Sequence, residues 1–136
     1  MPSEDRKHAV IRRAYRAFAA RDVTTLAEIS HPEIEIRAVT GALAHGGEPY
    51  VGVEGVAEYM RDVGEVWDEL ELLPAEFHEL DEERTLVFGR VLARRGSTLI
   101  DTPNAWLWRV RDGKVLSAEV YADPEAAIAL FGEDSS

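Results

Sequence analysis

Three β-rich segments near the end of the chain place the tightest limit on its fold. Residues 85–94 and 98–110 are rich in β-branched and aromatic residues and are separated by a short break. The segment Arg111-Asp112-Gly113-Lys114 supplies a hairpin turn, and residues 115–121 follow it as a last strand. The pattern is strand-like from Leu70 onward. Because short connections join antiparallel neighbours, the sequence predicts a run of four antiparallel strands.

The first part of the chain is predicted to be helical. Apolar residues recur at helical spacing from Ile11 to Phe18, and Ser3 supplies an N-cap for this first helix. Asp22 caps a short second helix, on which Leu26 and Ile29 point inward. This helix ends at His31-Pro32, because the residue before a proline avoids helical backbone.

The remaining segments complete an α+β pattern. Residues 33–37 alternate as a strand, residues 40–52 form a long glycine- and proline-rich loop, and residues 53–67 form a third helix. Asp123-Pro124 begins a closing helix. Helices that precede a meander predict an α+β fold, with the helices on one face of a curved antiparallel or mixed sheet.

Length and charge limit the classes of function. The 136 residues fit a single domain, with a core over about residues 5–131. Acidic residues exceed basic ones, 26 to 15, and the basic residues are dispersed, so we expect no nucleic-acid partner. No apolar run approaches the roughly 20 residues of a membrane helix, and the first residues resemble no signal peptide, which favours the cytoplasm.

Metal and cofactor motifs are not found in the sequence. It contains no cysteine, and its four histidines show no spacing typical of metal ligands. There is no glycine-rich phosphate loop and no dinucleotide fingerprint. We therefore expect neither a metal nor a cofactor.

Several short segments together resemble one family. They are Tyr15-Arg-Ala-Phe18, His31-Pro32-Glu33, Tyr50-Val-Gly-Val-Glu-Gly55, Ala105-Trp-Leu-Trp-Arg-Val-Arg-Asp-Gly-Lys114 and Val120-Tyr-Ala-Asp123. Their order and spacing resemble the SnoaL-like branch of the nuclear transport factor 2-like superfamily, which includes ketosteroid isomerases, polyketide cyclases and limonene epoxide hydrolases. The resemblance implies a cone: a curved sheet wrapped on three to four helices, with a pocket at its open end.

The resemblance and the alternation of strand residues together indicate which side chains face the pocket. The expected ligand-binding residues are Phe18, Ile36, Met60, Val63, Trp67, Gly89, Val91, Thr102, Trp106, Ala118 and Val120. The same inward faces carry Ala14, Tyr15, Ile34, Ala38, Val87, Ala93, Asn104, Trp108, Val110, Leu116 and Ala122. Nearly all of these residues are apolar, so we expect a small apolar ligand.

The carboxylates of the related enzymes have no counterpart here. Ala38 stands where the isomerase pattern places its general base, and Trp106 stands near its second aspartate. The acidic and basic residues of the epoxide hydrolase would fall on Ala93, Val91 and Val120. This leaves Asn104 and Tyr15 as catalytic candidates, which can stabilise a developing oxyanion but are not strong bases at neutral pH.

Two questions stay open at this point. Glu119 and Tyr121 alternate with the inward residues and should face outward, but a register shift of one residue would bring them into the pocket as an acid–base pair. The outward residues Ala105, Leu107, Ser117, Glu119 and Tyr121 favour a homodimer through the outer sheet face. The function is then an enzyme of the cyclase, isomerase or hydrolase kind, or a binding or structural module on the same fold.

Overall fold

The computed structural model describes residues 3–38, 49–121 and 125. In chain order the elements are α1 (Ser3–Ala19), α2 (Val23–Ile29), β1 (Ser30–Ala38), β2 (Tyr50–Val51), α3 (Gly52–Val66), β3 (Glu69–Glu79), β4 (Arg84–Arg95), β5 (Thr98–Arg111) and β6 (Lys114–Tyr121). This order confirms the α+β expectation. The expected closing helix, apart from Glu125, and Ala122 lie outside the described residues.

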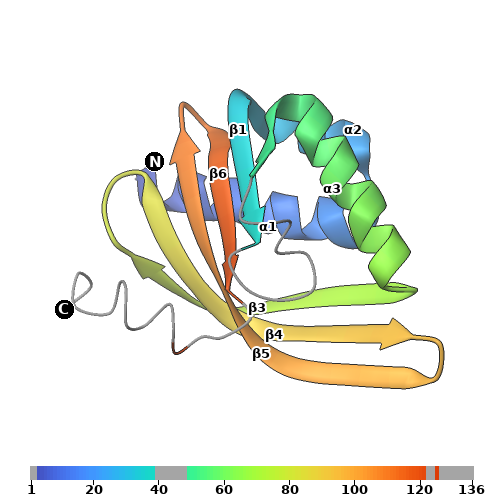
Figure 1. Cartoon of the computed structure of the whole chain (residues 1–136). Coiled ribbons are helices and arrows are strands. Elements are labelled where there is room, and N and C mark those ends of the chain that lie inside the picture. Colours follow the sequence, from blue (N-terminus) through green and yellow to red (C-terminus); the bar gives the residue numbers. More distant parts are fainter. Residues whose placement is uncertain (1–2, 39–48, 122–124, 126–136) are drawn as a thin grey trace.

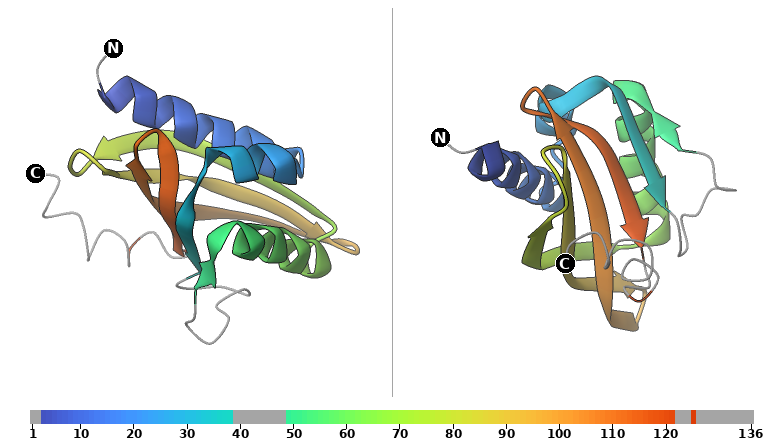
Figure 2. Two further views of the ribbon diagram at one scale, coloured as in Figure 1. Left: turned by 90° about the horizontal axis from the view of Figure 1, so that it is seen from above. Right: turned by 90° about the vertical axis from the view of Figure 1, so that its left-hand side faces the viewer.

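One six-stranded sheet, in the order β2-β1-β6-β5-β4-β3, forms the body of the molecule. The four strands from β3 to β6 pair antiparallel, as predicted. β1 lies parallel to β6, with Ile36 opposite Ala118, and antiparallel to β2, so the sheet is mixed. The sheet is strongly curved, and α1 and α3 lie against its concave side (Figures 1 and 2).

Local chemistry sets the limits of α2. Asp22 is its N-cap: one carboxylate oxygen accepts from the backbone N–H of Thr25 at 3.0 Å and the other from the Thr25 hydroxyl at 2.6 Å. At the other end, the Ser30 hydroxyl donates to the carbonyl oxygen of Leu26 at 2.5 Å. The bonds to the Thr25 N–H and to the Leu26 carbonyl satisfy backbone groups that a helix end leaves without partners.

A β-bulge between β5 and β6 changes the face on which Leu116 lies. Arg109 pairs with Ser117, but Val110 pairs with Val115, so β6 contains one extra residue at this point. Val115 therefore points toward the helices. Leu116 lies on the opposite surface, with Ser117 and Glu119. The expectation that Leu116 faces inward is wrong, because strict alternation ends at a bulge.

A second bulge lies between β3 and β4. Pro74 pairs with Gly89 and Glu76 with Phe88, which leaves one extra residue on β3. At this bulge the backbone of β3 comes so close to Gly89 that a Cβ atom there would lie 2.1 Å from the carbonyl oxygen of Leu73. Gly89 is therefore required for the approach of the two strands.

Hydrophobic residues gather in two clusters on opposite faces of the sheet. The main core joins the helices to the concave face and includes Ile11, Tyr15, Val87, Trp106 and Trp108. The second cluster consists of Leu86, Ala105, Leu107 and Tyr121, with Leu80 and Phe88 packed against it. The alternation that predicted Tyr121 to face away from the helices is confirmed.

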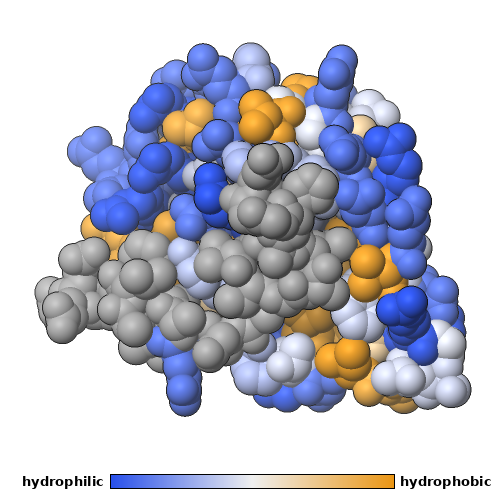
Figure 3. All heavy atoms as spheres, in the orientation of Figure 1, coloured by the Kyte–Doolittle hydropathy of each residue, from blue (hydrophilic) through white to orange (hydrophobic). Residues whose placement is uncertain are grey.

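The described residues on the face shown in Figure 3 are largely hydrophilic. In Figure 3 the hydrophobic residues on the visible face appear as separate patches among hydrophilic ones. Among the described residues, no helix has the length and apolar character needed to cross a membrane.

Candidate functional site

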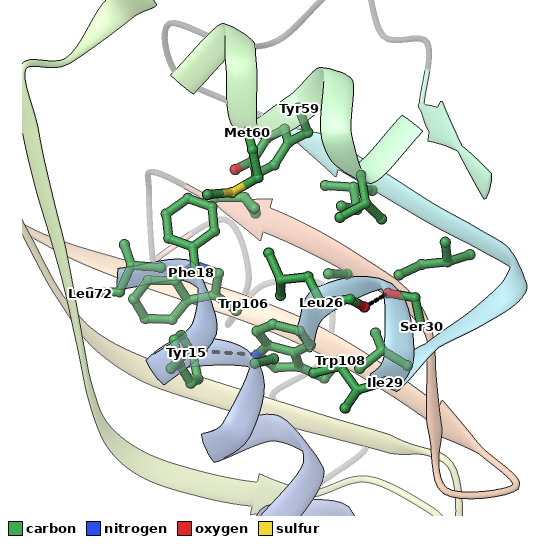
Figure 4. A pocket seen from close by; sticks show the side chains of 17 residues that line it. Tyr15, Phe18, Leu26, Ile29, Ser30, Tyr59, Met60, Leu72, Trp106 and Trp108 are labelled. Carbon is green, nitrogen blue, oxygen red and sulfur yellow. Dashed lines mark hydrogen bonds between the residues drawn. The ribbon is translucent and has the colours of Figure 1, made fainter. Parts of the chain in front are cut away.

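A small apolar pocket lies between the three helices and the concave face of the sheet (Figure 4). Its volume is about 60 Å³. Side chains from α1, α2, α3 and four of the strands line it. The lining residues are Ala14, Tyr15, Phe18, Leu26, Ile29, Ser30, Ile34, Ile36, Val56, Tyr59, Met60, Leu72, Trp106, Trp108, Val115, Ala118 and Val120.

Polar groups are few in this lining. The polar side-chain groups of the lining residues are the hydroxyls of Tyr15, Tyr59 and Ser30 and the indole N–H groups of Trp106 and Trp108. The lining contains no Asp, Glu, His, Lys or Arg side chain. Within the described part of the chain, no group of three or more His, Asp or Glu side chains is placed to hold a metal ion. The lining side chains therefore offer hydrogen bonds and apolar contact, and no charge.

Tyr15 is the most constrained of these polar residues. It is 4% exposed, and its ring packs edge-on against Trp106 and Trp108, with centroids 5.2 Å away in both cases. The Trp108 indole nitrogen donates to the Tyr15 hydroxyl oxygen at 3.0 Å. Burial raises the pKa of Tyr15 well above its usual value, and the Trp108 hydrogen bond offsets only part of this rise. Tyr15 is therefore a neutral phenol with its own proton available for donation.

Tyr59 and Phe18 form a second aromatic group in the lining. Their ring centroids lie 5.9 Å apart, and both side chains are partly buried. The ring centroid of Tyr50 lies 5.2 Å from that of Tyr59, and the Tyr50 hydroxyl donates to the Asp62 carboxylate at 2.7 Å. Removal from water raises the pKa of Tyr59 to about 12. Tyr59 is thus a second neutral phenol in the pocket.

The structure brings together seven of the predicted site residues. Tyr15, Phe18, Ile36, Met60, Trp106, Ala118 and Val120 all line the pocket. Tyr15 and Phe18 come from one face of α1, and Met60 comes from the buried face of α3. The other four residues come from β1, β5 and β6, which are neighbours in the sheet.

Six other predicted site residues lie outside the lining. Asn104 is 3% exposed, and its amide donates to the carbonyl oxygen of Ala105 at 3.3 Å, which is a structural contact. Trp67 caps the C-terminal end of α3, and Gly89 abuts the backbone of β3. The others are Val63, Val91 and Thr102.

Sequence reasoning did not include several lining residues among the site candidates. Ser30 and Val115 lie beside irregular backbone, namely the α2–β1 junction and the β6 bulge. Leu72 belongs to β3, whose register the sequence does not define. Tyr59 lies three residues after Val56 and next to Met60, and this helical spacing is the sequence pattern by which it could have been found.

Glu119 lies outside the pocket. It borders a groove on the outer face of the sheet, and the Tyr121 hydroxyl donates to its carboxylate at 2.9 Å. His78 is exposed beside Glu76 on β3. His45, on the predicted loop, lies outside the described residues. The alternative register, with Glu119 and Tyr121 as an internal acid–base pair, is therefore wrong.

Comparison with known proteins agrees with this architecture. The model of the SnoaL-like domain family matches residues 11–118, and the chain belongs to this family. Its fold is the one shared by nuclear transport factor 2-like proteins. No curated protein matches the sequence.

Solved structures similar to the chain cover nearly its whole length. One is TerC co-crystallised with polyporic acid, with 25% identity, a TM-score of 0.76, and coverage of 93% of this chain and 98% of that one. Another is a nuclear transport factor 2-like protein of unknown function from Burkholderia pseudomallei, with 24% identity, a TM-score of 0.76, and coverage of 92% and 96%. A third, assigned as a SnoaL-like polyketide cyclase from a Jannaschia species, has 16% identity, a TM-score of 0.75, and coverage of 95% and 93%.

Proposed function

We propose that the protein binds a small apolar molecule in this pocket and acts on it as an enzyme of cyclase or isomerase type. Membership of the SnoaL-like family and the similarity to TerC, which was crystallised with polyporic acid, support a small-molecule role. The observation that carries the proposal is the Tyr15 hydroxyl, which Trp108 holds inside a pocket without charged side chains.

Tyr15 supplies the chemistry in this proposal. Its oxygen accepts from Trp108, so its proton is left to donate to a carbonyl oxygen of the ligand. A hydrogen bond of this kind stabilises the negative charge that develops on the oxygen when a neighbouring carbon gives its proton to a water molecule or hydroxide ion from the solvent, because no described lining side chain is a base. Cyclisation and double-bond isomerisation both pass through such a charge. The apolar surroundings strengthen the interaction, because little water competes for the donor.

Hydrogen exchange next to a carbonyl tests the enzymatic proposal. The protein is incubated with tetralone in deuterium oxide, and exchange is followed by proton NMR. We expect faster exchange than in buffer, and a rate lower by about 100- to 1000-fold for Tyr15→Phe, the usual cost of losing one oxyanion donor. Glu119→Gln, on the outer face, should retain the wild-type rate. Equal rates for wild type and Tyr15→Phe would refute the role of Tyr15.

A non-catalytic binding protein is the second candidate. Its support is that the described lining holds no carboxylate or imidazole to accept a proton. Trp106 and Trp108 line the pocket whereas Trp67 does not, so ligand binding should change the fluorescence of the first two. Trp106→Phe should remove much of that change. A fluorescence response without any acceleration of exchange would favour binding alone.

We also propose that the chain forms a homodimer through the outer sheet face. The groove on this face carries both acids and arginines, among them Glu33, Glu35, Arg37, Arg109 and Glu119. In a two-fold dimer the same patch meets itself, so acids of one copy can face arginines of the other. Sedimentation should give twice the mass of one chain at micromolar concentration, and less after Arg109→Glu. A single-chain mass for the wild type would contradict the dimer.

A further inference from the structure

A cluster of charged side chains joins the start of α1 to the end of β3, outside the pocket. Lys7 is 5% exposed, and its ammonium donates to the Glu79 carboxylate and to the backbone carbonyl oxygen of Asp81, the latter at 2.7 Å. The other Glu79 oxygen lies 2.6 Å from Nε2 of His8 and accepts from the Thr85 hydroxyl at 2.9 Å. Glu79 is therefore the centre of the cluster, because both residues of α1 bind its carboxylate.

Phe77 adds a second attachment between the same two elements. The ring centroids of His8 and Phe77 lie 4.8 Å apart, and the Arg12 guanidinium lies 4.4 Å from the Phe77 ring centroid. Phe77 in turn packs against the main core. β3 thus holds α1 at successive turns, before the helix reaches the pocket at Ala14 and Tyr15.

Lys7 depends on Glu79 for its counter-charge. Among the side chains that the structure describes, Glu79 supplies the one carboxylate within ion-pair distance of the Lys7 ammonium. The nearby Asp81 carboxylate accepts from Arg84 at 2.7 Å, so its charge is already compensated. An ammonium that is left buried without a counter-charge is costly. A neutral side chain at position 79 would therefore favour movement of the start of α1 toward water.

The helix connects this cluster to the pocket. Tyr15 follows Lys7 by eight residues on one continuous helix that lies across the sheet (Figure 2), roughly 12 Å along its axis. Movement at the start of the helix is therefore transmitted to Tyr15. Trp108 reaches the Tyr15 hydroxyl at 3.0 Å, and a displacement of about 1 Å would exceed the roughly 3.2 Å reach of such a bond.

We propose that Glu79 is a positioning residue for Tyr15. Through Lys7 and His8 it fixes α1 along the sheet, and this keeps the Tyr15 hydroxyl on the Trp108 indole with its proton directed to the pocket. The consequence for catalysis rests on the proposed function of Tyr15. The coupling between Glu79 and the Tyr15–Trp108 bond is a property of the fold, and it can be measured without any ligand.

Nitrogen–proton NMR of the indole groups tests the coupling at neutral pH. Tyr15→Phe gives the position of the Trp108 indole resonance when the bond is absent. In Glu79→Gln the resonance should move from its wild-type position toward that reference. Exchange of the indole proton with solvent should accelerate by about threefold to tenfold, the net effect of one hydrogen bond. The indole of Trp67, which caps α3 outside the pocket, should not move.

Two further variants separate positioning from a general loss of structure. Glu76→Gln, which removes an exposed carboxylate from the same strand, should leave the Trp108 resonance unchanged. Lys7→Met in the Glu79→Gln background removes the uncompensated charge and keeps an unbranched side chain in its place. This double variant should return the resonance to its wild-type position. Thermal unfolding of each variant confirms that it is folded.

Acid provides a second route to the same state in the wild type. Burial opposes ionisation of Glu79, but its bonds to Lys7, His8 and Thr85 outweigh this and lower its pKa below 4.5. As the pH falls through this pKa, the Trp108 resonance should move in the direction seen for Glu79→Gln, in step with the Glu79 carboxyl carbon resonance. The movement should be absent in the double variant, in which position 79 does not titrate.

The outcomes separate this inference from the proposed function. A Trp108 resonance that stays in place in folded Glu79→Gln, or that moves equally in Glu76→Gln, overturns the inference and leaves the role of Tyr15 untouched. Failure of Lys7→Met to restore the resonance also overturns it, because the uncompensated ammonium would then not be the cause. If Glu79→Gln moves the resonance but Tyr15→Phe has no effect on catalysis, the coupling stands and the proposed function fails.

Discussion

The indole nitrogen of Trp108 donates to the phenol oxygen of Tyr15 over 3.0 Å, across 93 residues of sequence. This bond connects α1 to β5 through the pocket wall. Trp108→Phe removes the donor and leaves the Tyr15 oxygen buried. We expect the free energy of unfolding in urea to fall by about 1–3 kcal/mol for the unsatisfied oxygen, with a further loss for the smaller ring.

A double-mutant cycle isolates the hydrogen bond from the loss of volume. In the Tyr15→Phe background no phenol oxygen remains to be left without a partner, so Trp108→Phe should cost less there than in the wild type. The difference should be about 0.5–3 kcal/mol, the range for residues in direct contact. Strict additivity would mean that the bond contributes nothing to stability.

The raised pKa values of all four tyrosines predict that the fold loses stability at alkaline pH. Burial raises the pKa of Tyr15, Tyr50, Tyr59 and Tyr121, and hydrogen bonds to Asp62 and Glu119 raise those of Tyr50 and Tyr121 further. The folded chain therefore keeps protons that the unfolded chain loses above pH 10, the ordinary value for tyrosine. Stability should fall between pH 10 and about 12, by up to about 1.4 kcal/mol per pH unit for each tyrosine.

Urea denaturation at several alkaline pH values measures this slope. Tyr59→Phe removes one of the four groups and should reduce the slope by about one proton over this range. The ultraviolet absorbance of tyrosinate should rise together with unfolding rather than before it. A stability curve that is flat from pH 9 to 11 would be inconsistent with the buried phenols.

Gly89 should tolerate no side chain. A Cβ atom there would lie 2.1 Å from the Leu73 carbonyl oxygen and 2.9 Å from the Pro74 Cα atom. Since both contacts are to backbone, we expect Gly89→Ala to lower the free energy of unfolding by about 1–3 kcal/mol or more. Thermal and urea unfolding measure the loss.

Gly64 provides the matched control. A Cβ atom there meets only the end of the Arg21 side chain, which can move aside. Because alanine is favoured over glycine inside a helix by about 0.5–1 kcal/mol, Gly64→Ala in α3 should be neutral or stabilising. A similar loss for both variants would show that the close approach at Gly89 is not the cause.

Glu79 should anchor the start of α1 to the end of β3. Its carboxylate accepts from Lys7, from His8 at 2.6 Å and from Thr85 at 2.9 Å. Burial opposes ionisation, but these bonds together lower the pKa of Glu79 below 4.5. Glu79→Gln should cost about 1–3 kcal/mol at neutral pH, because buried Lys7 loses its counter-charge.

The stabilisation that Glu79 provides should depend on pH in a defined direction. A carboxylate whose pKa is lowered by folding stabilises the folded chain fully when the pH is above its pKa in the unfolded chain. This contribution disappears as the pH falls through its pKa in the folded chain. The advantage of the wild type over Glu79→Gln should therefore shrink below about pH 4.5. Glu76→Gln, which removes an exposed carboxylate beside His78, should change stability little at either pH. An advantage that persists undiminished in acid would argue against this role of Glu79.

Alternation along strands predicted one part of the pocket well. Trp106, Trp108, Ala118 and Val120 face inward because β5 and β6 keep a regular pleat around them. The same reasoning fails at Leu116, where the bulge adds a residue. Sequence periodicity contains no information about an extra unpaired residue of this kind.

Contacts between distant segments account for what the sequence could not predict. The bond between Trp108 and Tyr15 depends on how α1 crosses the sheet, and the place of β1 beside β6 depends on pairing between the two ends of the fold. The alternation along β5 places Asn104 on the inward face, but this residue pairs with Gly89 and lies outside the pocket lining. Helix and strand limits follow from local chemistry, whereas the boundary of a pocket follows from packing.

The parallel pairing of β1 with β6 has a consequence for synthesis of the protein on the ribosome. β1 is translated early, but its partner strand is the last strand of the sheet, with Ile36 opposite Ala118. The apolar faces of α1, α2 and β1 therefore remain without their final neighbours until β6 has emerged from the ribosome. Domains whose contacts are distant in sequence fold slowly and expose such faces meanwhile. During that interval these apolar faces are open to contact with other chains.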